Sequence, residues 1–169
     1  MELTKKERLI LYNQYEILKS LNPDEKEYYE IDQEILINGF KYNYDGLVRC
    51  FMDDTPEEIS QFVIDVLQMY SVLNNSYDKL KDDEKSQIDL YDISFTGFDG
   101  NEETDYYVYA KFYLEKLDKF GELKESEYYA VNSHANTLND YRKMVSLWKE
   151  VKTGRYNNVS LKNMQYIIG

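Results

Sequence analysis

The sequence predicts an all-α protein of six to seven helices around one long central helix, with negligible strand. Three observations support this class. Both prolines, Pro23 and Pro56, stand where a helix would begin, a position at which a missing backbone N–H costs nothing. Thr4 precedes Glu7 by three residues, the spacing of a helix capping box, and similar pairs occur later in the chain. Apolar residues recur every three or four positions through most of the sequence.

These start signals, and glycines at the expected stops, predict the helices in order. The expected ranges are 4–21, 23–38, 56–81, 101–120, 138–152 and 161–168, with a short further helix near 45–53.

Two of these helices have informative apolar faces. In the second, Tyr28, Ile31 and Ile35 form one face. The helix over 56–81 is the longest and most apolar, and Ile64 and Val72 lie outside its main apolar face. It is therefore predicted to be the central helix, with neighbours on more than one side.

The chain is expected to form a single domain over residues 1–169. It has 169 residues, 43% of them hydrophobic, which is enough for a sizeable core. The polar stretch 79–87 is the one plausible seam between subdomains. Because no apolar run reaches 18–20 residues and there is a single cysteine, Cys50, we expect a cytoplasmic protein that does not enter a membrane.

The charge balance argues against direct binding to nucleic acid. The chain has 32 acidic and 20 basic residues, a formal net charge of −12, and its basic residues are interleaved with acids. A phosphate-binding surface needs a basic patch. An acidic mimic of nucleic acid is a further alternative, but it would need carboxylates in a regular stripe, whereas here they are scattered.

Most catalytic and metal-binding constellations are missing from the sequence. One histidine, His134, cannot supply a di-iron or HExxH zinc site, and no phosphate loop or nucleophile elbow is present. The segment 99–105 resembles a calcium loop only faintly, since Phe95 and Gly97 would fall at ligand positions. We expect no metal and no cofactor, and no catalytic residue can be named.

The first helix nevertheless carries hydrogen-bonding side chains in its middle. Gln14 falls at the centre of the apolar face that Ile10, Ile17, Leu18 and Leu21 bracket, and Asn13 lies at its border. Gln14 is therefore predicted to be buried and hydrogen-bonded between helices, as a polar anchor. The alternative is a contact inside a small-molecule pocket.

Several segments resemble the YfbU family of small bacterial cytoplasmic proteins. The opening "LTKKERLILYNQYEILKSLNP" and the later blocks "GFKYNYDGLVRCF", "VIDVLQMYSVLNNSY", "FTGFDGNEE" and "YRKMVSLW" resemble those of the family in the same order. The resemblance covers nearly the whole chain and is weakest over 122–136. It implies an all-helical protein and brings no catalytic residues with it.

The sequence thus favours a non-enzymatic, self-associating interaction or regulatory protein. A homodimer is expected, through the face of the central helix that bears Ile64 and Val72, together with an unidentified protein partner. The alternative is an enzyme or small-ligand-binding protein. Its pocket would lie near Gln14 and Asp65, with Asn13 and Tyr70 as further contacts.

Overall fold

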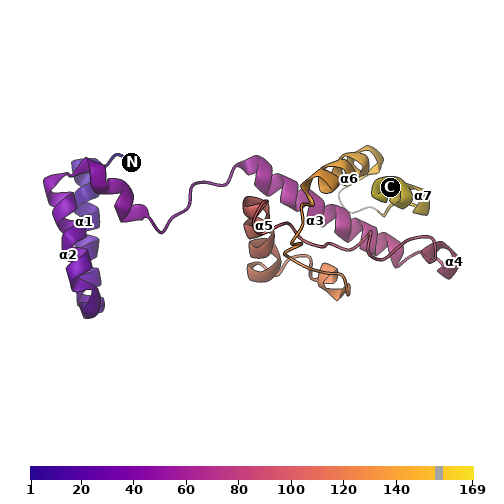
Figure 1. Cartoon of the computed structure of the whole chain (residues 1–169), viewed down its shortest axis with the longest axis horizontal. Coiled ribbons are helices and arrows are strands. Elements are labelled where there is room, and N and C mark those ends of the chain that lie inside the picture. The colour runs from indigo at the N-terminus through magenta and orange to yellow at the C-terminus, as the bar shows by residue number, and fades with distance from the viewer. Residues whose placement is uncertain (155–157) are drawn as a thin grey trace. The chain divides into compact units, whose positions relative to one another are not determined.

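The computed structural model describes residues 1–154 and 158–169, and it confirms the all-α class (Figure 1). Within these residues the one β-type contact is an isolated parallel bridge between Phe98 and Asn132. No helix among them is long and apolar enough to cross a membrane. The chain divides into two compact units, residues 1–54 and 55–169. The division falls at 54/55, and the stretch 79–87, expected as a seam, lies inside the second unit.

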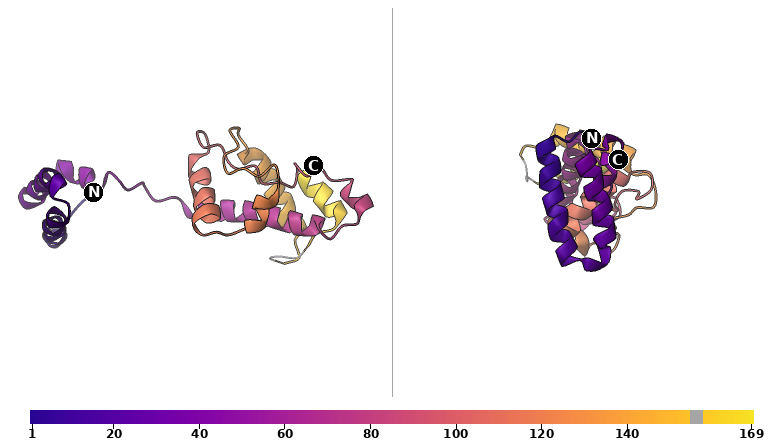
Figure 2. Two further views of the ribbon diagram at one scale, coloured as in Figure 1. Left: turned by 90° about the horizontal axis from the view of Figure 1, so that it is seen from below. Right: turned by 90° about the vertical axis from the view of Figure 1, so that its left-hand side faces the viewer.

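The first unit is an antiparallel helical hairpin (Figure 2). Its elements are α1 (Lys5–Leu21), the short 3₁₀ helix η1 (Pro23–Glu25), α2 (Lys26–Asn38) and the 3₁₀ helix η2 (Lys41–Val48). Thr4 begins α1 with the predicted capping box, since its hydroxyl accepts from the Glu7 N–H and its own N–H donates to the Glu7 carboxylate. Gly39 ends α2 in the left-handed conformation, at φ 69°.

The second unit is built around α3 (Glu57–Tyr77), which lies between the other helices in Figure 1. The flanking elements are α4 (Asp82–Lys85), α5 (Thr104–Lys111), the π-helical turn η3 (Phe112–Lys116), the 3₁₀ helix η4 (Gly121–Glu125), α6 (Leu138–Val151) and α7 (Leu161–Ile168). α3 is buried on nearly every side, as the sequence predicts for the central helix. Val72, expected to lie on a dimer face, is buried within its own chain, and Ile64 is half-buried.

Three expected elements differ in detail. The helix predicted over 56–81 ends at Tyr77, because Asn74, Asn75 and Ser76 bond back to carbonyls one turn earlier and weaken the helical ladder. The helix predicted over 101–120 is a short α5 followed by the π-helical turn. The short helix expected near 45–53 is instead the earlier 3₁₀ helix η2.

Candidate functional site

The hairpin is held together by a polar contact that the sequence did not reveal. Gln33 of α2 is only 4% exposed, and its amide nitrogen donates to the Tyr12 carbonyl at 3.1 Å and to the Glu16 carboxylate at 2.7 Å. The rings of Tyr15 and Tyr29 pack beside it, with centroids 5.9 Å apart. A buried carboxamide that bonds to a backbone carbonyl across two helices is the role that the sequence assigned to Gln14.

Gln14 itself is exposed on the hairpin, so α2 does not bury it, contrary to the expectation of a contact between these two helices. Three of the apolar residues around it are also exposed, Ile10 to 49%, Ile17 to 61% and Leu21 to 70%, and the fourth, Leu18, is half-buried. α1 has more than one face that could be buried, and in this two-helix unit α2 covers the face with Tyr12 and Tyr15. Asn13, at the border of the exposed stripe, is exposed as well.

In the second helix, too, the predicted apolar face is exposed. Tyr28 and Ile31, predicted to share an apolar face, are 68% and 59% exposed, and Ile35 is half-buried. Counted at about 100° per residue, this stripe and that of α1 each lie roughly 100° or more from the side chains that join the helices. Because the helices are antiparallel, that rotation brings both stripes to one side of the hairpin. We call Ile10, Gln14, Ile17, Leu21, Tyr28, Ile31 and Ile35 the hairpin face.

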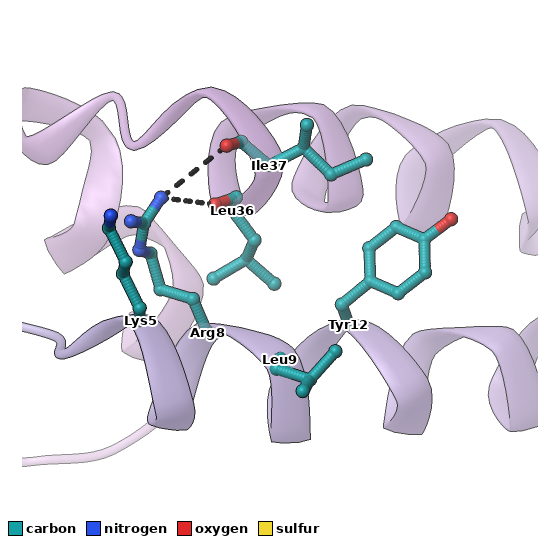
Figure 3. Close-up of a pocket in the computed structure, with 6 residues that line it drawn as sticks. All are labelled: Lys5, Arg8, Leu9, Tyr12, Leu36 and Ile37. Atoms are coloured by element: carbon teal, nitrogen blue, oxygen red, sulfur yellow. Dashed lines mark hydrogen bonds between the residues drawn. The ribbon is translucent and has the colours of Figure 1, made fainter.

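Another side of the hairpin contains a shallow apolar cavity of about 340 Å³ (Figure 3). Arg8 stands at one end of the cavity and donates from Nη1 to the carbonyl oxygens of Leu36, at 2.7 Å, and Ile37, at 3.4 Å. Lys5, Leu9 and Tyr12 complete the lining from α1. The guanidinium is committed to the C-terminal carbonyls of α2, where a positive charge is favourable, so its role here is that of a helix cap.

Asp65 and Tyr70 both lie on α3 but contact different partners. Asp65 is buried and accepts from the Lys149 ammonium at 2.5 Å and from Gln61 at 3.1 Å. It therefore joins α3 to α6 as half of an ion pair.

Tyr70 belongs to a buried aromatic cluster. Its ring lies 5.6 Å from that of Tyr141 and 5.9 Å from that of Phe95, and its hydroxyl lies 3.7 Å from the Met144 sulfur. Burial raises the pKa of Tyr70 well above its ordinary value and that of Tyr141 to about 12. Both phenols keep their protons near neutral pH, so they can donate hydrogen bonds but cannot act as general bases there.

Beside this cluster lies a cavity of about 220 Å³ that Tyr70 and Tyr141 help to line. Its rim carries the exposed carboxylates of Asp92 and Asp140, with the hydroxyls of Thr96 and Thr137 nearby. This lining contains neither Asp65 nor a cationic side chain.

Glu103 is a buried carboxylate whose role the sequence did not reveal. It is 3% exposed, and it accepts from the N–H groups of Thr137 and Leu138 at 2.9 and 2.7 Å, from the Thr137 hydroxyl at 3.1 Å and from the Asp99 N–H at 3.0 Å. It thus caps α6 from a distant part of the chain. Only its position beside Glu102, in a segment already identified as a helix start, pointed to it.

The stretch 122–136, where the resemblance to the family is weakest, also packs against this region. Gly97, at φ 90°, leaves room for it: a Cβ built there would lie 2.3 Å from the Val131 carbonyl oxygen. The side-chain oxygen of Asn132 accepts from the Gly100 N–H at 3.1 Å. These contacts make the stretch part of the fold. Among the described residues, no three His, Cys, Asp or Glu side chains gather as a metal site would require.

Comparison with known proteins agrees with the resemblance seen in the sequence. A family model described as the YfbU domain matches residues 1–169. A curated relative, the UPF0304 protein MJECS11 of Methanocaldococcus jannaschii, is 38% identical over 159 residues, which is 92% of this chain and 92% of the relative.

Proposed function

The chain belongs to the YfbU family, and we propose that it is a non-enzymatic, self-associating interaction or regulatory protein whose contact surface is the hairpin face. The observation that carries this proposal is the inverted packing of the hairpin. Its polar and aromatic side chains join the two helices, and its aliphatic stripes are left exposed.

Exposed aliphatic stripes on a folded unit favour association. Full burial of one such side chain contributes about 1.5–3 kcal/mol. Ile10, Ile17, Leu21 and Ile31 are each roughly half exposed or more, and they lie on one side of the hairpin. Contiguous apolar patches of this kind are typical of protein–protein contact surfaces.

The homodimer now depends on a different surface from the one that the sequence favoured. Val72 is buried by its own chain, so this face of the central helix is not free to contact a second copy. The hairpin face takes its place.

The alternative, a ligand pocket near Gln14 and Asp65, has weaker support. These residues belong to different units, residues 1–54 and 55–169, and the cavities at Arg8 and at Tyr70 are lined by neither. Nucleic-acid mimicry and a separate protein partner stay as predictions.

Light scattering coupled to size exclusion tests the proposal. At micromolar concentration we expect a mass near 40.6 kDa, twice the 20.3 kDa of one chain. Ile17→Lys places a charge in the hairpin face and is expected to weaken the dimer by tenfold or more, about 1.4 kcal/mol.

Tyr42→Lys is the matched control, because Tyr42 is 96% exposed on η2 and lies outside the hairpin face. It introduces the same charge and should leave the dimer intact. A wild-type mass of one chain across the micromolar range would remove the proposal.

A further inference from the structure

We infer that Gln14 of one copy hydrogen-bonds to Gln14 of a second copy across a two-fold axis and so fixes the register of the dimer. This inference rests on the proposed function and goes further, because it names the partner of the hairpin face as the same face of another chain. It also assigns a role to the one polar residue at the centre of the α1 stripe.

The spacing of the α1 stripe is that of a coiled-coil seam. Ile10, Gln14, Ile17 and Leu21 follow one another at intervals of four, three and four residues, the a/d pattern of two heptads. A helix with this seam packs best against another helix with the same seam. α2 does not fill this role in its own hairpin, since it covers a different side of α1.

The chemistry of the stripe favours a second copy over a different protein. None of its side chains is charged, so two copies of a chain of net charge −12 can meet there without placing charges opposite each other. A carboxamide has both donors and acceptors, so Gln14 is complementary to itself. In a contact whose two-fold axis passes this position, the symmetry places Gln14 of one copy opposite Gln14 of the other.

The size of the face is sufficient for a specific contact. α1 has 17 residues and is therefore about 25 Å long, and two neighbouring helices span roughly 20 Å. The flat footprint is then roughly 500 Å² per copy, or on the order of 1,000 Å² for the pair, which is where specific interfaces begin.

A polar residue in an apolar seam reduces affinity and restricts the arrangement. Any register that places Gln14 against an isoleucine leaves its amide desolvated and unpaired, which costs free energy. Registers and oligomeric states that pair the two carboxamides are therefore favoured. A single polar residue at an a position has the same effect in coiled coils.

Disulfide trapping tests the pairing directly. In a Cys50→Ser background, which removes the exposed native thiol, Gln14→Cys should form a covalent dimer under mild oxidation, because the two short side chains would face each other across the two-fold axis and a small approach of the helices would bring the Cβ atoms into the ~3.5–4.5 Å range of a disulfide. Ser20→Cys is the matched control: Ser20 is exposed on the same helix but about 120° away, and it should give little covalent dimer.

Gln14→Leu provides a second measurement that does not depend on cross-linking. It should tighten self-association by about tenfold or more while the single dimer mass gives way to a mixture of oligomeric states. A wild-type dimer whose Gln14→Cys variant does not cross-link, and whose Gln14→Leu variant has the same affinity and mass, would overturn the Gln14 pairing alone. A wild-type monomer would overturn the proposed function as well.

Discussion

Glu103 shows how much a single buried side chain can contribute to this fold. Its carboxylate replaces the side-chain cap that α6 lacks and ties that helix to the segment before α5. Glu103→Gln keeps the shape but turns an amino group toward backbone N–H donors. We expect a loss of about 2–3 kcal/mol in the free energy of unfolding, measured by urea denaturation with Trp148 of α6 as the fluorescent reporter. Glu102→Gln, at the exposed neighbour, should cost less than about 0.5 kcal/mol; equal losses in the two variants would contradict the capping role.

Tyr141 makes the stability of the second unit sensitive to alkaline pH. Its pKa is raised by burial to about 12 in the folded state, against about 10 when unfolded. Above pH 10 the unfolded chain loses this proton first. The contribution of this group to stability is therefore fully present below pH 10 and falls as pH rises toward 12, by up to about 2.7 kcal/mol.

Tyr141→Phe should lower stability slightly at pH 7, because the Thr96 contact at 3.2 Å is lost, and should make the decline between pH 10 and 11 shallower. Urea midpoints at pH 8, 10 and 11 measure this; parallel declines in the two proteins would refute it.

Among the elements, three helices match their predicted ranges closely. α1, α6 and α7 begin and end within a residue of the expected ranges. α5 was predicted too long, because the sequence does not reveal the π-helical turn or the left-handed residues Asp118 and Phe120 that follow it. Local propensity determines whether a helix forms, but tertiary contacts determine where it stops.

Periodicity predicts a helix and its apolar face, but it does not say which face the neighbouring helix will cover. The sequence placed Gln14 on a buried face and did not single out Gln33. In the hairpin these roles are exchanged. A Gln beside Tyr29 and Leu36 on α2 was the available signal, and it was weaker than the aliphatic stripe. The alternative that Asn13, Gln14, Asp65 and Tyr70 line one pocket stays a prediction, because periodicity along the chain does not predict contacts between distant segments.

Arg8 provides a test at the scale of the hairpin. Its guanidinium caps the last turn of α2, so Arg8→Met removes two hydrogen bonds and a favourable charge while keeping the length of the side chain. We expect the hairpin to lose about 1–2 kcal/mol of local stability. Hydrogen exchange at the Gly39 and Phe40 amides, which bond to the Ile35 carbonyl, reports it as a faster rate. Lys5→Met, at a neighbouring cation that lines the same cavity, is the control and should leave these amides protected.

The whole molecule combines a strongly acidic composition with an uncharged hairpin face, and for the proposed dimer this combination predicts how association responds to salt. Copies of net charge −12 repel one another, and salt screens that repulsion while the apolar contact is unaffected or strengthened. Raising sodium chloride from about 50 to about 500 mM should therefore tighten the dimer, as sedimentation equilibrium would show. Weaker association at high salt would instead indicate a contact made through ion pairs.

The contacts that shape the hairpin are all made within the first third of the chain. Arg8 reaches Leu36, and Gln33 reaches Tyr12 and Glu16, so every residue needed for the hairpin face precedes residue 54. Ribosomes deliver the N-terminal part of a protein first. The surface is therefore complete while α3 to α7 are still being synthesised, and neighbouring nascent chains on one messenger can meet before either has finished. The proposed homodimer through this face therefore predicts that association begins during translation, before the second core is complete.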